Sequence, residues 1–324
     1  MTISKRLPAI ASAIVLAAAA TAGADTISDI VNQVSQAGYT DYLDNALYTH
    51  NGSDRGLTGA QHDPARANIA SALSSFGLAT SLDPFTYSGG TYYNVVGIHP
   101  GAVRPDTVYI VGAHYDSVNN PGADDDASGV AGVLEAARVL SKYQFQATLV
   151  FIAFDREEQG LIGSGHYASQ HSADAIAGMV SMDMIAYNPA GEHHDKAFLY
   201  GRDASLPLKQ ALGSAIAVYG NGVTSEIGGD VPSSDHAPFE AAGKQACLLI
   251  EHAVWNNPYY HQAGDSVDTA GYIDYQYATN LTRGVVGYLA SEAVVVPEPG
   301  IAVLLATGGV VVFWMTWRRR TRRG

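Results

Sequence analysis

The sequence predicts an α/β protein, a single domain in which helices cover both faces of a mostly parallel or mixed central β-sheet. Short apolar runs alternate along the chain with longer segments whose apolar residues recur at helical spacing, and such alternation is typical of three-layer α/β/α folds. One run, ATLVFIAFD at residues 147–155, is apolar almost throughout. That pattern is typical of a strand buried on both faces.

Each expected element has its own signal. Short runs rich in apolar and β-branched residues predict strands at 91–101, 106–117, 147–155, 178–187, 196–201 and 245–252. Helical spacing predicts helices at 26–50, 63–77, 126–143, 206–220 and 272–293. Pro64 near the start of the second helix and Gly77 after it are start and stop signals.

The N-terminus has the pattern of a secretory signal peptide. Lys5 and Arg6 precede the apolar run AIASAIVLAAAATAGA, which ends in small residues at 22–24. We therefore expect residues 1–24 to be removed on export, which places the protein in the periplasm, at the cell surface or outside the cell. An uncleaved membrane anchor is the alternative.

The C-terminus, residues 297–324, has three parts. The motif VPEPG is followed by 17 apolar residues, 301–317, and then by RRRTRRG. A 17-residue helix is about 25 Å long, just enough for a bilayer core. This tail resembles the PEP-CTERM sorting signal, and the resemblance implies cleavage by an exosortase-type enzyme and contact with the membrane only through this segment. A plain C-terminal anchor is the alternative.

The remaining segment, 25–296, is expected to be the folded domain. It carries 11 basic and 30 acidic residues, a net charge of −19 with histidine neutral. Such a domain repels nucleic acid and anionic membranes, so we expect neither as a partner. The chain has one cysteine, Cys247, so no intrachain disulfide is possible.

Chemically active side chains stand where predicted strands end. They are His114 and Asp116, three aspartates in PGADDDASGVAG (121–132), Asp155 with Glu157 and Glu158, and His261 in a loop rich in turn formers, together with Asp183, which is expected inside the apolar strand at 178–187. Each alone has an ordinary interpretation as a solvated loop residue, although a buried unpaired Asp183 would be costly. Together, at the carboxyl ends of strands, they predict a metal site. A mixture of histidine and carboxylate ligands favours zinc over calcium.

The motifs GAHYDS, PGADDDASGVAGVLEAARVL, FIAFDREEQGLIGSGHYA, GMVSMDMIAY, SSDHAPFEAAG and YYHQAGDSVD resemble the M28 family of dinuclear zinc aminopeptidases over residues 90–290. The resemblance implies a zinc-peptidase-like fold and two zinc ions per chain, bridged by Asp125. His114 and Asp183 would complete one zinc site, and Glu158 and His261 the other. Glu157 would be the general base and Asp116 the partner of the His114 ring.

The expected function is that of an exported zinc aminopeptidase, which hydrolyses peptides with a free N-terminus. Two zinc ions would activate a shared water for attack on the peptide carbonyl, and Glu157 would take its proton. Another M28-like activity, as a carboxypeptidase or glutaminyl cyclase, and a non-catalytic surface protein on the same scaffold are the alternatives.

Several neighbouring residues have expected supporting roles. We expect Asp126 to cap the following helix and Asp124 to hydrogen-bond within its loop. Ser234, Asp235 and His236 are interpreted as structural rather than as ligands. The segment WNNPYY (255–260) either lines the substrate pocket or packs as a compact loop.

Overall fold

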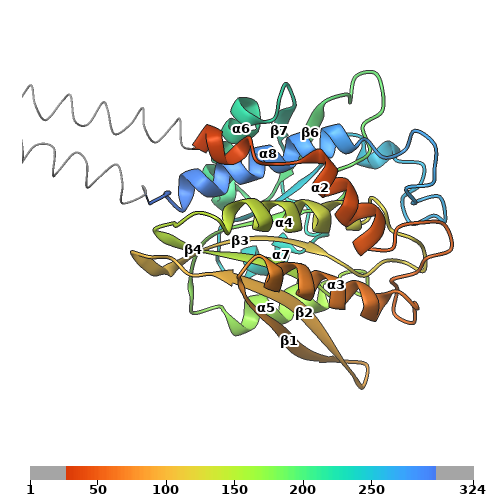
Figure 1. Ribbon diagram of the computed structural model, residues 1–324, viewed down its shortest axis with the longest axis horizontal. Coiled ribbons are helices and arrows are strands. Elements are labelled where there is room, and N and C mark those ends of the chain that lie inside the picture. The colour runs from red at the N-terminus through yellow and green to blue at the C-terminus, as the bar shows by residue number, and fades with distance from the viewer. Residues whose placement is uncertain (1–26, 297–324) are drawn as a thin grey trace, which may run out of the picture.

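A computed structural model of the chain describes residues 27–296 and places eight strands in one sheet (Figure 1). The strands are β1 (Ala79–Tyr87), β2 (Gly90–His99), β3 (Arg104–His114), β4 (Ala147–Phe154), β5 (Ala175–Met182), β6 (Lys196–Tyr200), β7 (Thr224–Ile227) and β8 (Ala246–Glu251). Their order across the sheet is β1-β2-β4-β3-β5-β8-β6-β7. The predicted signal peptide and C-terminal tail lie outside the described residues.

The centre of the sheet is parallel and its edges are mixed. Strands β4, β3, β5 and β8 run in one direction, whereas β2 pairs antiparallel with β4 and β6 pairs antiparallel with β8. The carboxyl ends of the four central strands therefore meet at one edge. All eight residues of β4 are buried, as the apolar run predicts.

Helices cover both faces of the sheet, which confirms the predicted fold class. The larger core lies under α2 (Gln36–Asp41), the π-helical turn η1 (Tyr42–Ala46), α3 (His62–Ser75), α4 (Ala127–Leu140), α6 (Leu206–Tyr219) and α8 (Tyr275–Glu292). A smaller core on the other face includes residues of α5 (Ile162–Gln170) and α7 (His236–Ala241). Figure 1 shows α4, α6 and α8 on one side of the sheet and α5 on the other.

Some elements differ from the sequence prediction. The expected helix at 26–50 is divided into a turn of helix at 27–31, α2 and η1, and the elements β1, β7, α5 and α7 were not predicted. β1 contains Pro84 and is mostly exposed, and β7 has no buried residue, so neither carries the apolar pattern of a core strand. Within residues 27–296, no helix combines the length and apolar character needed to cross a membrane.

Candidate metal centre

The functional residues meet where the central strands end. β3 ends at His114, Asp155 follows β4, and Asp183 follows β5 as the first residue after the strand rather than within it. The amino end of α4 enters at the same edge and brings Asp125 and Asp126 with it. Because parallel strands bring their carboxyl ends together, His114 and Asp183, 69 positions apart in the chain, share one site.

Two groups of side chains could each hold a metal ion. In the first, His114, Glu157 and Asp183 place one ligand atom each within 4.8 Å of the others. Nε2 of His114 lies 3.8 Å from Oδ1 of Asp183 and 4.0 Å from Oε2 of Glu157. The second group, Asp125, Glu158 and His261, meets the same condition.

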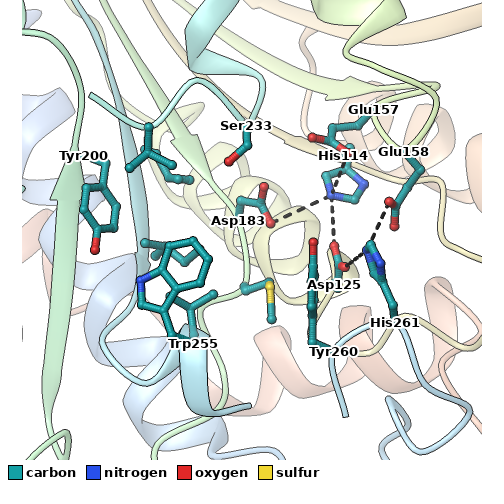
Figure 2. Close-up of a pocket in the computed structure, with 15 residues that line it drawn as sticks. His114, Asp125, Glu157, Glu158, Asp183, Tyr200, Ser233, Trp255, Tyr260 and His261 are labelled. Atoms are coloured by element: carbon teal, nitrogen blue, oxygen red, sulfur yellow. Dashed lines mark ion pairs between the residues drawn. The ribbon is translucent and has the colours of Figure 1, made fainter. Parts of the chain in front are cut away.

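Asp125 lies between the two groups. Its Oδ1 is 3.2 Å from Nε2 of His114, and its Oδ2 is 3.1 Å from Nε2 of His261. The same His261 nitrogen lies 3.2 Å from Oε2 of Glu158. Figure 2 shows His114 and His261 next to Asp125, and Glu158 next to His261. A carboxylate that offers one oxygen to each group is suited to bridge two ions.

The electrostatics of the cluster favour a bound cation. Burial, with the charge of Asp125, raises the pKa of Glu158 to about 7 and that of Asp183 to about 6. Burial likewise raises the pKa of Glu157 well above its usual range. Hydrogen bonds to Asp125 and Glu158 raise the pKa of His261 to about 10. The carboxylates thus repel one another and stabilise positive charge on their histidine neighbours.

The donor set fits zinc. Oε1 of Glu158 is buried and has no hydrogen-bond partner among the described residues, although Oε2 faces His261. A buried carboxylate oxygen without a partner is costly unless it is paired or coordinates a metal. Imidazole nitrogen and carboxylate oxygen are both ordinary zinc ligands.

Asp116 links the end of β3 to the two glutamates. Its carboxylate accepts the backbone N–H groups of Glu157 at 3.2 Å and Glu158 at 3.3 Å. Nδ1 of His114 lies 3.1 Å from the carbonyl oxygen of Asp116 and 3.6 Å from its carboxylate. Asp116 therefore lies beside the His114 ring, as expected, and also orients the backbone that carries Glu157 and Glu158.

The aspartates beside Asp125 bind different parts of the fold. Asp126 accepts the Gly129 N–H at 2.9 Å, which confirms its predicted role as the cap of α4. Asp124 does not bond within its loop as expected. Its Oδ1 instead accepts the N–H of Ala186 at 2.8 Å, because the loop turns this side chain toward the segment that follows β5.

Two residues that hold the Asp125 loop were not predicted. The carboxylate of Asp265 accepts the N–H of Asp124 at 2.7 Å and that of Asp125 at 3.2 Å. Arg55 is fully buried and donates to the carbonyls of Tyr115 and Gly122, both at 2.8 Å. Nothing local in the sequence marks either residue, since each acts on a segment more than 50 positions away.

The SSDH segment supports the site without joining either metal group. Ser234 donates to Oδ2 of Asp183 at 2.7 Å. Asp235 is buried with both carboxylate oxygens unpartnered among the described residues, and burial raises its pKa to about 7. His236 is also buried, and burial lowers its pKa to about 4. None of these three residues belongs to either of the two candidate metal groups.

An apolar pocket opens beside the metal groups. Its wall is formed by the side chains of Met184, Tyr200, Val231, Leu248, Ile250, Val254, Trp255 and Tyr260. Figure 2 shows Tyr200 and Trp255 on the side away from the histidines. Trp255 and Tyr260 of the WNNPYY segment therefore line this pocket. Met184, Leu248 and Ile250 were missed because their apolar pattern is that of core residues.

Fold and site together define a class of protein: α/β proteins with a pair of candidate metal sites at the carboxyl edge of the sheet and an apolar pocket beside them. The model of peptidase family M28 matches residues 94–288. This match spans more than half of the chain, and the chain belongs to peptidase family M28.

Among curated proteins, leupeptin-inactivating enzyme 1 of Streptomyces exfoliatus is 34% identical over 203 residues, 61% of this chain and 44% of that enzyme. The chain spans less than half the length of the first curated relatives it matches.

Among solved structures, BSAP, a zinc aminopeptidase from Bacillus subtilis, is 29% identical with a TM-score of 0.56, covering 66% of this chain and 52% of that one. The LapA aminopeptidase of Legionella pneumophila has a TM-score of 0.72 at 22% identity, covering 83% and 75%. At 22% identity, the similarity to LapA shows a shared fold alone.

Proposed function

We propose that this chain is a zinc-dependent aminopeptidase with two zinc ions. The observation that carries the proposal is the place of Asp125, which offers one carboxylate oxygen to each of two histidines. Membership of family M28 and the similarity to the zinc aminopeptidase of Bacillus subtilis support it.

The residue roles follow the two groups. His114 and Asp183 would hold one zinc, Glu158 and His261 the other, and Asp125 both. Bound zinc ions would polarise the substrate carbonyl and lower the pKa of a water molecule. Glu157 lies in the first group and lines the pocket, where it would accept a proton and return it to the leaving amine.

The apolar pocket is proposed to receive the side chain of the N-terminal residue. Its wall combines aliphatic, thioether and aromatic groups, so it offers few polar partners to a charged side chain. We therefore expect N-terminal leucine, methionine or phenylalanine to be released faster than aspartate or lysine.

The decisive experiment is a set of matched peptides with free, acetylated and N-terminal glutamine ends, incubated with the purified protein. We expect release of the first residue from free peptides only, inhibition by a zinc chelator and recovery with zinc. Release from the carboxyl end would instead indicate a carboxypeptidase. Loss of ammonia from the glutamine peptide without cleavage would indicate a glutaminyl cyclase, and no reaction would indicate a non-catalytic protein.

We also propose that the protein is exported and that its C-terminal tail is a PEP-CTERM signal processed by an exosortase-type enzyme. The support is the sequence of the two ends, with a basic and apolar leader at 1–24 and the three-part tail at 297–324. The net charge of −19 between them suits a domain that stays off anionic membranes.

A further inference from the structure

The segment from His252 to His261, here called the rim loop, carries a predicted zinc ligand and part of the pocket wall. Val254, Trp255, Tyr260 and His261 all line the pocket. Apart from the short 3₁₀ turn at Val254–Asn256, the loop has no regular structure. Its position therefore determines both the second metal group and the shape of the pocket.

Asn257, in the middle of the rim loop, reaches groups that lie beneath the site. Its amide nitrogen is 3.0 Å from Oδ2 of Asp124 and 2.9 Å from Oε1 of Glu251, with the Tyr272 hydroxyl at 3.2 Å. Both carboxylates are fully buried. Asp124 directly precedes Asp125, and Glu251 ends β8. This contact therefore joins the loop to the sheet and to the residue next to Asp125.

The orientation of the Asn257 amide follows from its partners. Its oxygen accepts the backbone N–H of Tyr259 at 3.0 Å, and the Tyr259 ring packs edge-on against Tyr272 at 4.6 Å. The amide nitrogen is a donor only, so it must face the two carboxylates. A flipped amide would place its oxygen against Asp124 and Glu251 and leave both without this donor.

The neighbouring Asn256 provides a matched comparison. It has the same side chain but is exposed, and its amide lies 3.2 Å from Nε2 of His193 on a neighbouring loop. It does not line the pocket. The two asparagines thus have the same side chain but different partners: Asn257 faces the buried carboxyl groups, and Asn256 faces His193.

We propose that Asn257 is a positioning residue, which holds the rim loop so that Trp255 and His261 keep their places relative to Asp125. Its effect on hydrolysis rests on the proposed function, whereas its effects on loop order and metal binding do not. An asparagine suits this role because its amide nitrogen donates to both buried carboxyl groups, while its oxygen accepts the Tyr259 N–H and closes the turn.

The test uses the full chain with Trp314→Phe and Trp317→Phe, which leaves Trp255 as the single tryptophan of the three in the sequence. Asn257→Ala, Asn257→Asp and the control Asn256→Ala are compared in this background. Time-resolved fluorescence anisotropy of Trp255 reports the order of the rim loop directly. Zinc affinity is measured by competition with a chromogenic chelator, and KM and kcat with a leucine-terminated peptide.

We expect Asn257→Ala to lower the residual anisotropy of Trp255. We also expect it to lower the affinity for one of the two zinc ions about 10–100-fold, the usual effect of losing a group that orients a ligand. KM should rise more than kcat falls. Asn257→Asp keeps the shape but sets a third carboxylate against Asp124 and Glu251, so its effect should be larger. Asn256→Ala should match the parent in all three measurements.

The proposal is overturned if either folded Asn257 variant keeps the anisotropy and zinc affinity of the parent, or if Asn256→Ala changes them equally. Should the parent hydrolyse no peptide at all, the proposed function fails, yet the anisotropy and zinc measurements still decide the role of Asn257.

Discussion

The Ser234 hydroxyl donates a hydrogen bond of 2.7 Å to Oδ2 of Asp183. The other oxygen of this carboxylate, Oδ1, faces Nε2 of His114 at 3.8 Å. One oxygen is therefore held by the protein, and the other is left for a metal ion. Ser234 is itself buried and lies 3.2 Å from the Ser181 hydroxyl, so its own orientation is restrained.

Replacing Ser234 with alanine should therefore weaken zinc binding at the His114–Asp183 group, since Asp183 would lose the partner that orients it. We expect a loss of about 10–100-fold in affinity for one zinc ion, with the other unaffected. Competitive zinc titration checks this, with Ser214→Ala on the exposed side of α6 as the control. Unchanged affinity for both ions would show that the hydrogen bond does not orient the ligand.

Removing the metal should lower thermal stability as well as activity. A ligand that binds only the folded chain stabilises it by about 2.7 kcal/mol at a concentration 100 times its Kd. For a domain of this size that corresponds to roughly 5–10 °C in Tm. We expect about two zinc ions per chain by elemental analysis, and a lower Tm after chelation that zinc restores. An identical Tm with and without zinc would argue against the site.

Much of the site could be predicted because its residues follow strong local signals. His114, Glu157, Glu158 and Asp183 each stand at or just beyond the end of an apolar strand, and strand order brings such ends together. Asp126 stands at the start of a clear helical pattern, so its role as a helix cap could also be predicted from the sequence. Their individual roles toward zinc remain predictions.

Other contributions have no local signature. Asn257, Asp265 and Arg55 act on residues far away in the chain, and only the folded arrangement shows what they touch. The pocket residue Ile250 alternates with core residues on β8, and the sequence cannot tell which side of that strand faces a cavity. The strands β1 and β7 were missed because exposed edge strands lack an apolar pattern.

The C-terminal tail should be removed in the native host. Mass spectrometry of the mature protein is expected to place its end near residues 296–299. If the arginines at 318–323 remain, the tail is a plain anchor. Deleting residues 297–324 should leave zinc binding and hydrolysis unchanged, because the proposed ligands lie between residues 114 and 261. Loss of activity on deletion would show that the tail has a role in the folded enzyme.

Glu157 and Glu158 are adjacent and have the same side chain, but they face different groups. Oε2 of Glu158 lies 3.2 Å from His261, whereas Oε2 of Glu157 lies 4.0 Å from His114. If Glu158 is a ligand, Glu158→Ala should weaken or empty one zinc position. If Glu157 is the base, Glu157→Gln should keep both zinc ions, since it preserves the shape of the side chain.

The expected kinetic result for Glu157→Gln is a loss of roughly 10²–10⁴ in kcat, the usual contribution of a general base, with KM little changed. A competitive inhibitor that binds through the metal ions should bind this variant as tightly as the parent. Glu157 also lies within the first metal group, so it has the geometry of a possible ligand. If Glu157→Gln loses zinc while Glu158→Ala retains both zinc and activity, the roles assigned to the two glutamates are wrong.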